Sequence, residues 1–149
     1  MGDASVHPTA GNAPAWAPLF AAWLVAATST LGALYFGEVV ELPICVLCWY
    51  QRIFMFPLAL ILPFGLFPPD RRIIRSALAL AVPGALVAGY HLLLASGVIP
   101  KPLRPCEQGI PCSETVIQWF GFLTIPLLSA VAFSTIIALL VTAHRRSST

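Results

Sequence analysis

Four long apolar segments constrain the fold of this chain more than any other feature of its sequence. They lie at about 17–36, 49–67, 73–95 and 119–141. Each has close to the roughly 20 residues that a helix needs to cross about 30 Å of hydrocarbon. Backbone groups in a bilayer must be hydrogen-bonded within the protein, so such segments fold as helices. The sequence predicts an all-α integral membrane protein in which residues 16–143 form one four-helix bundle.

The composition agrees with a protein that has little mass outside the bilayer. Of the 149 residues, 58% are hydrophobic and only 9% are charged, whereas soluble domains carry roughly a quarter charged residues. The net charge of +2 is too small to suggest a nucleic-acid partner. Residues 1–15 lack apolar periodicity and predict a disordered tail. This tail also lacks the Lys or Arg of a signal peptide, so we expect the first helix to be permanent.

Basic residues near the segment ends predict the orientation in the membrane. Three arginines follow the second segment, and two more lie in the expected C-terminal tail, residues 144–149. Loops rich in Lys and Arg stay in the cytoplasm, which places both termini there and both cysteine pairs on the extracytoplasmic side. We therefore expect a multi-pass membrane protein. The arginines on which this prediction rests are Arg71, Arg72, Arg75, Arg145 and Arg146.

Proline occurs in three of the four segments. Pro57 and Pro63 fall in the second segment, Pro83 in the third and Pro126 in the fourth. We expect these residues to kink the helices rather than end them, because neighbouring helices can satisfy the freed carbonyl groups.

Cys45 and Cys48 form a Cys-x-x-Cys pair where a polar loop meets the second segment. Thiols with this spacing at a helix N-terminus have lowered pKa values and exchange readily, which favours a redox couple over two buried cysteines that only fill space. Arg52 follows Cys48 by one helical turn and so shares its face. It is either a cation that stabilises a thiolate or a reduced acceptor, or an anchor at the lipid headgroups.

Two further groups could belong to the same site. His91 lies near the outer end of the third segment, at the expected depth of Arg52, and ionisable groups within a membrane are functional candidates; the alternative is a histidine bonded to a carbonyl or to water. Cys106 and Cys112 lie in a loop with prolines and a glycine, either as an exchangeable disulfide or as a loop-stabilising bridge. A zinc site made of the four cysteines fits poorly because five residues separate the second pair, so we predict no metal.

These motifs together resemble those of the DsbB family of bacterial quinone-dependent membrane thiol oxidases. The resemblance rests on Cys45-Val46-Leu47-Cys48-Trp49-Tyr50-Gln51-Arg52, on the second cysteine pair, and on Trp119-Phe120-Gly121-Phe122 before Ile125-Pro126. It extends over all four segments. The short spacing of Cys106 and Cys112 is similar to the compact BdbC-type members.

The resemblance implies an oxidoreductase that reoxidises an extracytoplasmic thioredoxin-like (DsbA-like) thiol oxidase and passes two electrons to ubiquinone or menaquinone. By position, Cys106 would form the mixed disulfide with the partner, and the released Cys112 would pair with Cys45. Cys48 would meet the quinone as a thiolate, in a charge-transfer or covalent adduct. Arg52, and by its depth His91, would bind the quinone headgroup.

Two alternative functions remain open on the sequence. One is an enzyme of the vitamin K epoxide reductase type, although there the Cys-x-x-Cys motif would be expected after the loop pair rather than before it. The other is a non-enzymatic four-span scaffold whose loops are held by two structural disulfides.

Overall fold

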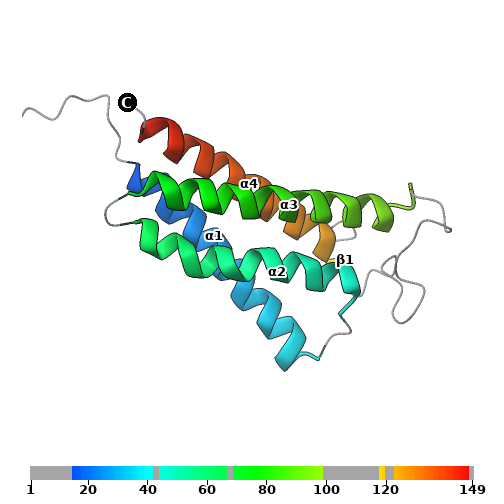
Figure 1. Cartoon of the computed structure of the whole chain (residues 1–149). Coiled ribbons are helices and arrows are strands. Elements are labelled where there is room, and N and C mark those ends of the chain that lie inside the picture. Colours follow the sequence, from blue (N-terminus) through cyan, green and yellow to red (C-terminus); the bar gives the residue numbers. More distant parts are fainter. Residues whose placement is uncertain (1–14, 42–43, 67–68, 99–117, 120–122, 148–149) are drawn as a thin grey trace, which may run out of the picture.

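The structure is a computed structural model that describes residues 15–41, 44–66, 69–98, 118–119 and 123–147. Within these ranges it has four helices that are long and apolar enough to cross a membrane. This confirms the predicted fold class. The helices are α1 (Trp16–Leu34), α2 (Val46–Ile61), α3 (Arg71–Ala95) and α4 (Ile125–Arg146) (Figure 1). The tail expected at residues 1–15 lies, apart from Ala15, outside the described residues.

Short elements extend two of the helices. A π-helical turn, η1 (Tyr35–Val39), continues α1, and a 3₁₀ turn, η2 (Leu62–Gly65), continues α2. The spans that result are Trp16–Val39 and Val46–Gly65. The second span therefore begins at Val46 rather than at residue 49, which places Cys48 inside the first turn of α2.

The start of the fourth helix differs from the prediction. Residue 119 was expected to begin it, but strand β1 (Gln118–Trp119) pairs antiparallel with strand β2 (Leu123–Thr124), and α4 begins only at Ile125. Pro126 lies in the first turn of α4, where its fixed φ suits a helix and its missing N–H costs no hydrogen bond. It therefore helps to start α4 instead of interrupting it. Pro57 and Pro83, in contrast, lie inside α2 and α3 as predicted.

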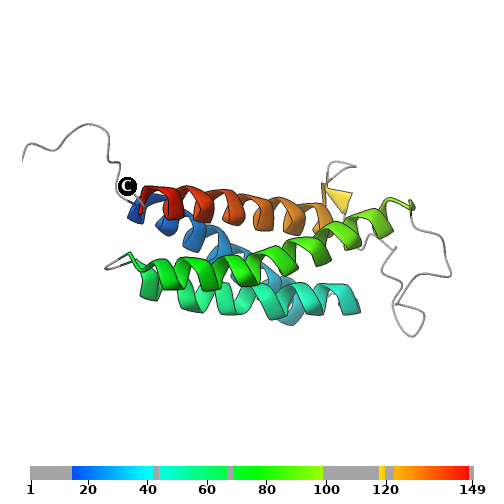
Figure 2. The same ribbon diagram turned by 45° about the horizontal axis from the view of Figure 1, so that its top comes forward.

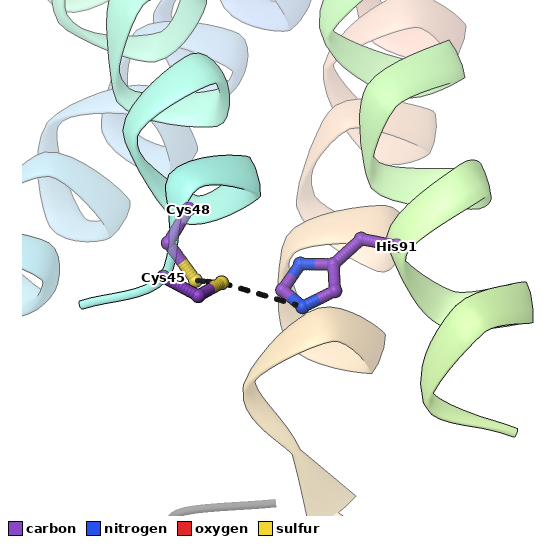
Figure 3. Close-up of side chains that lie close together, drawn as sticks. All are labelled: Cys45, Cys48 and His91. Carbon is purple, nitrogen blue, oxygen red and sulfur yellow. Dashed lines mark hydrogen bonds between the residues drawn. The ribbon is translucent and has the colours of Figure 1, made fainter. Parts of the chain in front are cut away.

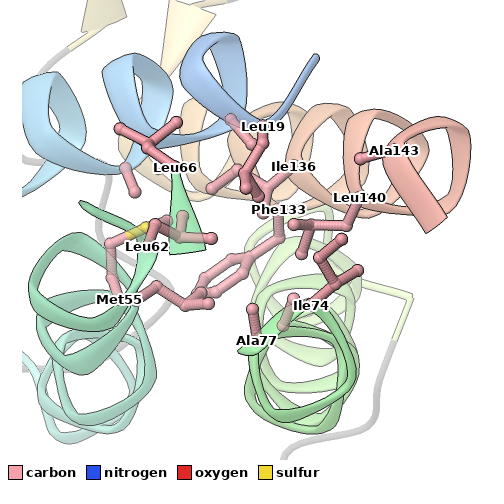
Figure 4. Packing of buried hydrophobic residues seen from close by; sticks show 14 of the residues in the cluster. Leu19, Met55, Leu62, Leu66, Ile74, Ala77, Phe133, Ile136, Leu140 and Ala143 are labelled. Carbon is pink, nitrogen blue, oxygen red and sulfur yellow. The ribbon is translucent and has the colours of Figure 1, made fainter. Parts of the chain in front are cut away.

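The helices form an antiparallel bundle in which α3 packs against α2 and α4, and α1 packs against α2 and α4 (Figures 1 and 2). Phe133 of α4 lies at the centre of the apolar core and is fully buried (Figure 4). Its ring lies directly against Gly84 of α3, where a Cβ atom would come within 2.9 Å of three ring atoms. A small residue lets two membrane helices approach closely, and such contacts hold bundles together in lipid.

The two ends of the bundle differ in chemistry. The start of α3 meets the end of α4, where Arg71 Nε donates to Ser147 Oγ at 3.4 Å. We call this the arginine end, defined by Arg71, Arg72, Arg145 and Arg146. The opposite end holds the start of α2 and the end of α3, and we call it the cysteine end, defined by Cys45, Cys48 and His91 (Figure 1).

The contact between Gly84 and Phe133 predicts a stability difference between two matched variants. Gly84→Ala should lower the midpoint of thermal unfolding in detergent, because overpacking a core costs about 1–3 kcal/mol. Gly89→Ala lies on the same helix, and apart from neighbouring residues and the backbone of its own helix nothing is within 4 Å of its added Cβ. Both variants gain the same helix propensity of about 1 kcal/mol. Equal midpoints for the two variants would show that the close approach is unimportant.

Candidate redox site

Cys45 and Cys48 lie side by side at the mouth of α2. Cys45 is the N-cap residue in an extended conformation, and Cys48 lies in the first helical turn. Their side chains point toward each other, and the two Sγ atoms are hydrogen-bonded at 3.3 Å (Figure 3). Both are free thiols. A small movement would therefore bring the sulfur atoms to the roughly 2.05 Å of a disulfide bond.

His91 of α3 faces this pair from the neighbouring helix. Its Nε2 atom lies 3.7 Å from Cys45 Sγ (Figure 3), and the side chain is only 3% exposed. Leu47 and Leu94 pack with Cys45 in a small apolar cluster that joins the start of α2 to the end of α3. The histidine predicted at this depth is thus in contact with the dithiol.

Gln51 completes the group and was not among the predicted site residues. Its Nε2 atom lies 3.0 Å from His91 Nδ1, and both side chains are buried. Gln51 lies between Leu47 and Met55 on the buried stripe of α2. A polar residue on an apolar stripe at a spacing of four is the signal that could have revealed it. When the amide nitrogen donates to Nδ1, the proton of a neutral His91 is on Nε2, facing Cys45.

Hydrogen bonding favours the thiolate form of Cys45, which precedes the membrane span of α2. The bond with Cys48, followed by the bond with His91, lowers the pKa of the Cys45 thiol to about 4, although burial acts in the opposite direction. A thiol with this pKa is deprotonated at neutral pH. It is therefore a good leaving group when a Cys45 disulfide is attacked.

Arg52 lies on the other side of the dithiol, toward α1. Its Nη2 atom donates to the Ala33 carbonyl oxygen at 2.6 Å, and its guanidinium lies 5.6 Å from the centre of the Trp49 ring. Gly37 of η1 leaves room for this arrangement, since a Cβ there would come within 2.7 Å of Nη2. Arg52 was predicted to share the face of Cys48. The contacts with α1 and Trp49 were not predicted.

The structure thus brings four predicted site residues to one end of the bundle: Cys45, Cys48, Arg52 and His91. Cys106 and Cys112 lie outside the described residues, so their roles stay predictions. Four membrane helices with a paired dithiol at the mouth of one helix have the architecture of a membrane thiol–disulfide oxidoreductase.

Comparison with known proteins identifies the family. A family model described as "Disulfide bond formation protein DsbB" matches residues 15–143, and the chain belongs to this family. It is 44% identical over 119 residues to disulfide bond formation protein C of Bacillus subtilis (strain 168), covering 80% of this chain and 86% of the relative. It is 45% identical over 134 residues to a probable disulfide formation protein of Metapseudomonas resinovorans, covering 89% and 93%. No solved structure matches the chain.

The family assignment confirms the resemblance predicted from the motifs, including the likeness to the compact C-type members. The protein is a multi-pass membrane oxidoreductase that forms disulfide bonds. This function favours an enzyme over a scaffold. Membership of the DsbB family likewise favours a DsbB-type enzyme over one of the vitamin K epoxide reductase type.

The hydrogen bonds of Cys45 predict how its thiol titrates. In reduced protein carrying Cys106→Ser and Cys112→Ser, the ultraviolet absorbance of the Cys45 thiolate should persist below pH 6 and fall near pH 4, whereas an ordinary thiol titrates near pH 8.5. Cys48→Ala should raise this pKa more than His91→Leu, because the bond with Cys48 is the larger cause. A Cys45→Ser variant supplies the baseline. Titration near pH 8.5 would contradict the assignment.

Proposed function

We propose that this protein is a quinone-dependent thiol oxidase that reoxidises an extracytoplasmic thioredoxin-like (DsbA-like) enzyme. The observation that carries the proposal is the Cys45–Cys48 dithiol at the mouth of a membrane helix, with His91 on one side and Arg52 on the other. A helix mouth is where a water-borne thiol and a lipid-borne electron acceptor can both reach one pair of sulfur atoms. Membership of the disulfide-forming DsbB family supports the same role.

The orientation belongs to this proposal. We place the arginine end in the cytoplasm and the cysteine end on the extracytoplasmic face of the bacterial inner membrane. The positive-inside rule supports this placement. The common location of Arg71, Arg72, Arg145 and Arg146 at one end of the bundle adds to that support. Disulfide formation also requires an oxidising compartment.

Thiol–disulfide exchange would carry electrons from the partner to the dithiol. A partner thiolate attacks Cys106 of the Cys106–Cys112 disulfide, and Cys112 leaves as a thiolate. The second partner thiolate then displaces Cys106, so the partner gains a disulfide and the loop pair is reduced by two electrons. Cys112 next attacks Cys45 of the Cys45–Cys48 disulfide and Cys48 leaves, after which Cys106 displaces Cys45. The loop disulfide is restored, and Cys45 and Cys48 hold the two electrons as a dithiol.

The residues near Cys48 fit a quinone. A bound quinone supplies the two-electron acceptor, and its carbonyl oxygens require hydrogen-bond donors as negative charge develops on them. Arg52 is a permanent cation with five N–H donors, and the Ala33 carbonyl takes one of them. The Trp49 ring lies against the guanidinium, and Gly37 leaves room for it. We therefore propose that Arg52 binds the quinone headgroup and that the thiol of Cys48 is the one nearest to the quinone.

His91 acts first on Cys45 in this account. Its Nε2–H can donate to the Cys45 thiolate, and this bond stabilises Cys45 as the leaving group when Cys106 displaces it from Cys112. Gln51 holds the ring in place through its contact with Nδ1. Contact of His91 with the quinone headgroup stays a prediction.

Two substitutions separate electron transfer from quinone binding. Cys48→Ser should abolish quinone reduction by a reduced partner, since no Cys45–Cys48 disulfide can form. Arg52→His should mainly raise the apparent KM for quinone by roughly 10- to 100-fold, because a hydrogen bond to a charged group contributes about 1.5–3 kcal/mol. Quinol formation measured with ubiquinone and menaquinone analogues checks both variants and shows which quinone is preferred. Undiminished activity of Cys48→Ser would refute the mechanism.

Gly37 offers a test that leaves the charge of Arg52 unchanged. Gly37→Ala should displace the guanidinium, because the added Cβ would lie 2.7 Å from Nη2 and 3.0 Å from Ile44 Cδ1. The apparent KM for quinone should rise several-fold while the maximal rate changes little. Gly32→Ala, whose Cβ meets no atom within 4 Å, is the matched control. Equal KM values for the two variants would argue against a role for Arg52 in quinone binding.

A further inference from the structure

Three soft metal ligands from two helices converge at the cysteine end. Cys45 Sγ, Cys48 Sγ and His91 Nε2 all lie within 4.8 Å of one another. Figure 3 shows the sulfur of Cys45 between the sulfur of Cys48 and the ring nitrogen of His91. The sequence had suggested only the cysteines as ligands. The histidine from α3 supplies the third donor that the Cys-x-x-Cys pair lacks.

The distances suit one tetrahedral zinc ion. Zinc binds thiolate sulfur at about 2.3 Å and imidazole nitrogen at about 2.0–2.1 Å, so two donors on the same ion lie roughly 3.4–3.8 Å apart. The two Sγ atoms are 3.3 Å apart, and Cys45 Sγ is 3.7 Å from His91 Nε2. The third pair, Cys48 Sγ and His91 Nε2, lies within 4.8 Å, so rotation of these side chains would bring all three donors around one ion, with water as the fourth ligand.

We propose that the reduced enzyme binds one Zn²⁺ ion through Cys45, Cys48 and His91, and that this ion blocks its reoxidation. Binding releases to solvent any protons held by the two thiols, and no electron is transferred. Oxidation of the same thiols to a disulfide removes both sulfur ligands, so the bound ion and the disulfide exclude each other. Zinc would thus hold the enzyme in its reduced state whatever the electron acceptor is, which makes this inference independent of the quinone.

Gln51 is suited to support the ion. A histidine that binds a metal through Nε2 carries its proton on Nδ1 and donates it to an acceptor. Gln51 already lies 3.0 Å from Nδ1, and rotation of its amide by half a turn presents the oxygen instead of the nitrogen. One amide therefore supports both forms of His91, with the proton on Nε2 beside a thiolate or on Nδ1 beside a metal.

Cobalt titration of the full chain tests the proposal. The protein carries Cys106→Ser and Cys112→Ser, so that only the Cys45–Cys48 pair can supply thiolates. Anaerobic Co²⁺ should give the thiolate charge-transfer and d–d absorption of a tetrahedral site, at one ion per reduced chain. Zn²⁺ should displace it. Protein oxidised to the Cys45–Cys48 disulfide should give no such spectrum. The same Co²⁺ spectrum from reduced and oxidised protein would overturn the proposal, and this comparison requires no substitution among the proposed ligands.

Single substitutions then test the ligand set. His91→Leu should weaken Co²⁺ binding by more than the roughly 10- to 100-fold that loss of a supporting hydrogen bond costs, and Gln51→Met should fall within that range. His144→Leu is the matched histidine control near the opposite end of the bundle, and it should bind as tightly as the parent. If His91→Leu also binds like the parent, the ion is held by the cysteines alone and the proposed site is wrong.

Discussion

The contact between the start of α2 and the end of α3 is the interaction on which the site depends. Gln51 and His91 are the buried polar residues of the described chain, and they are hydrogen-bonded to each other across these two helices. Polar side chains at membrane depth are costly unless they are paired, so this bond both joins the helices and fixes the imidazole. Leu47 and Leu94 pack with Cys45 across the same two helices. The position of Cys45 relative to His91 Nε2 follows from this packing.

The dithiol thereby has two different surroundings. On the α3 side Cys45 contacts the imidazole of His91, which Gln51 holds in place. On the α1 side Arg52 is held by Ala33 and Trp49. We propose that the imidazole beside one sulfur and the guanidinium near the other let the two cysteines differ in role, with Cys45 suited to exchange with thiols and Cys48 to an acceptor that becomes negatively charged.

Much of this architecture could be predicted from the sequence, because hydrophobic length determines the membrane spans and Cys-x-x-Cys spacing determines which sulfur atoms can meet. The fourth helix was placed too early, since an aromatic and apolar stretch in a strand pair cannot be told from a helix by hydropathy alone. Gln51 was missed because its role depends on which residue of α3 faces it. The register between two helices is a property of packing that periodicity does not reveal. The same holds for Ala33 and Gly37 around Arg52.

The central claim is that the Cys45–Cys48 dithiol delivers its electrons to a quinone. The most direct test mixes fully reduced Cys106→Ser/Cys112→Ser protein with a soluble quinone analogue in the absence of oxygen, then quantifies quinol by absorbance and disulfide by mass spectrometry after alkylation. One quinol should form for each Cys45–Cys48 disulfide. Quinol formation while both thiols remain alkylatable, or disulfide formation without quinol, would contradict it.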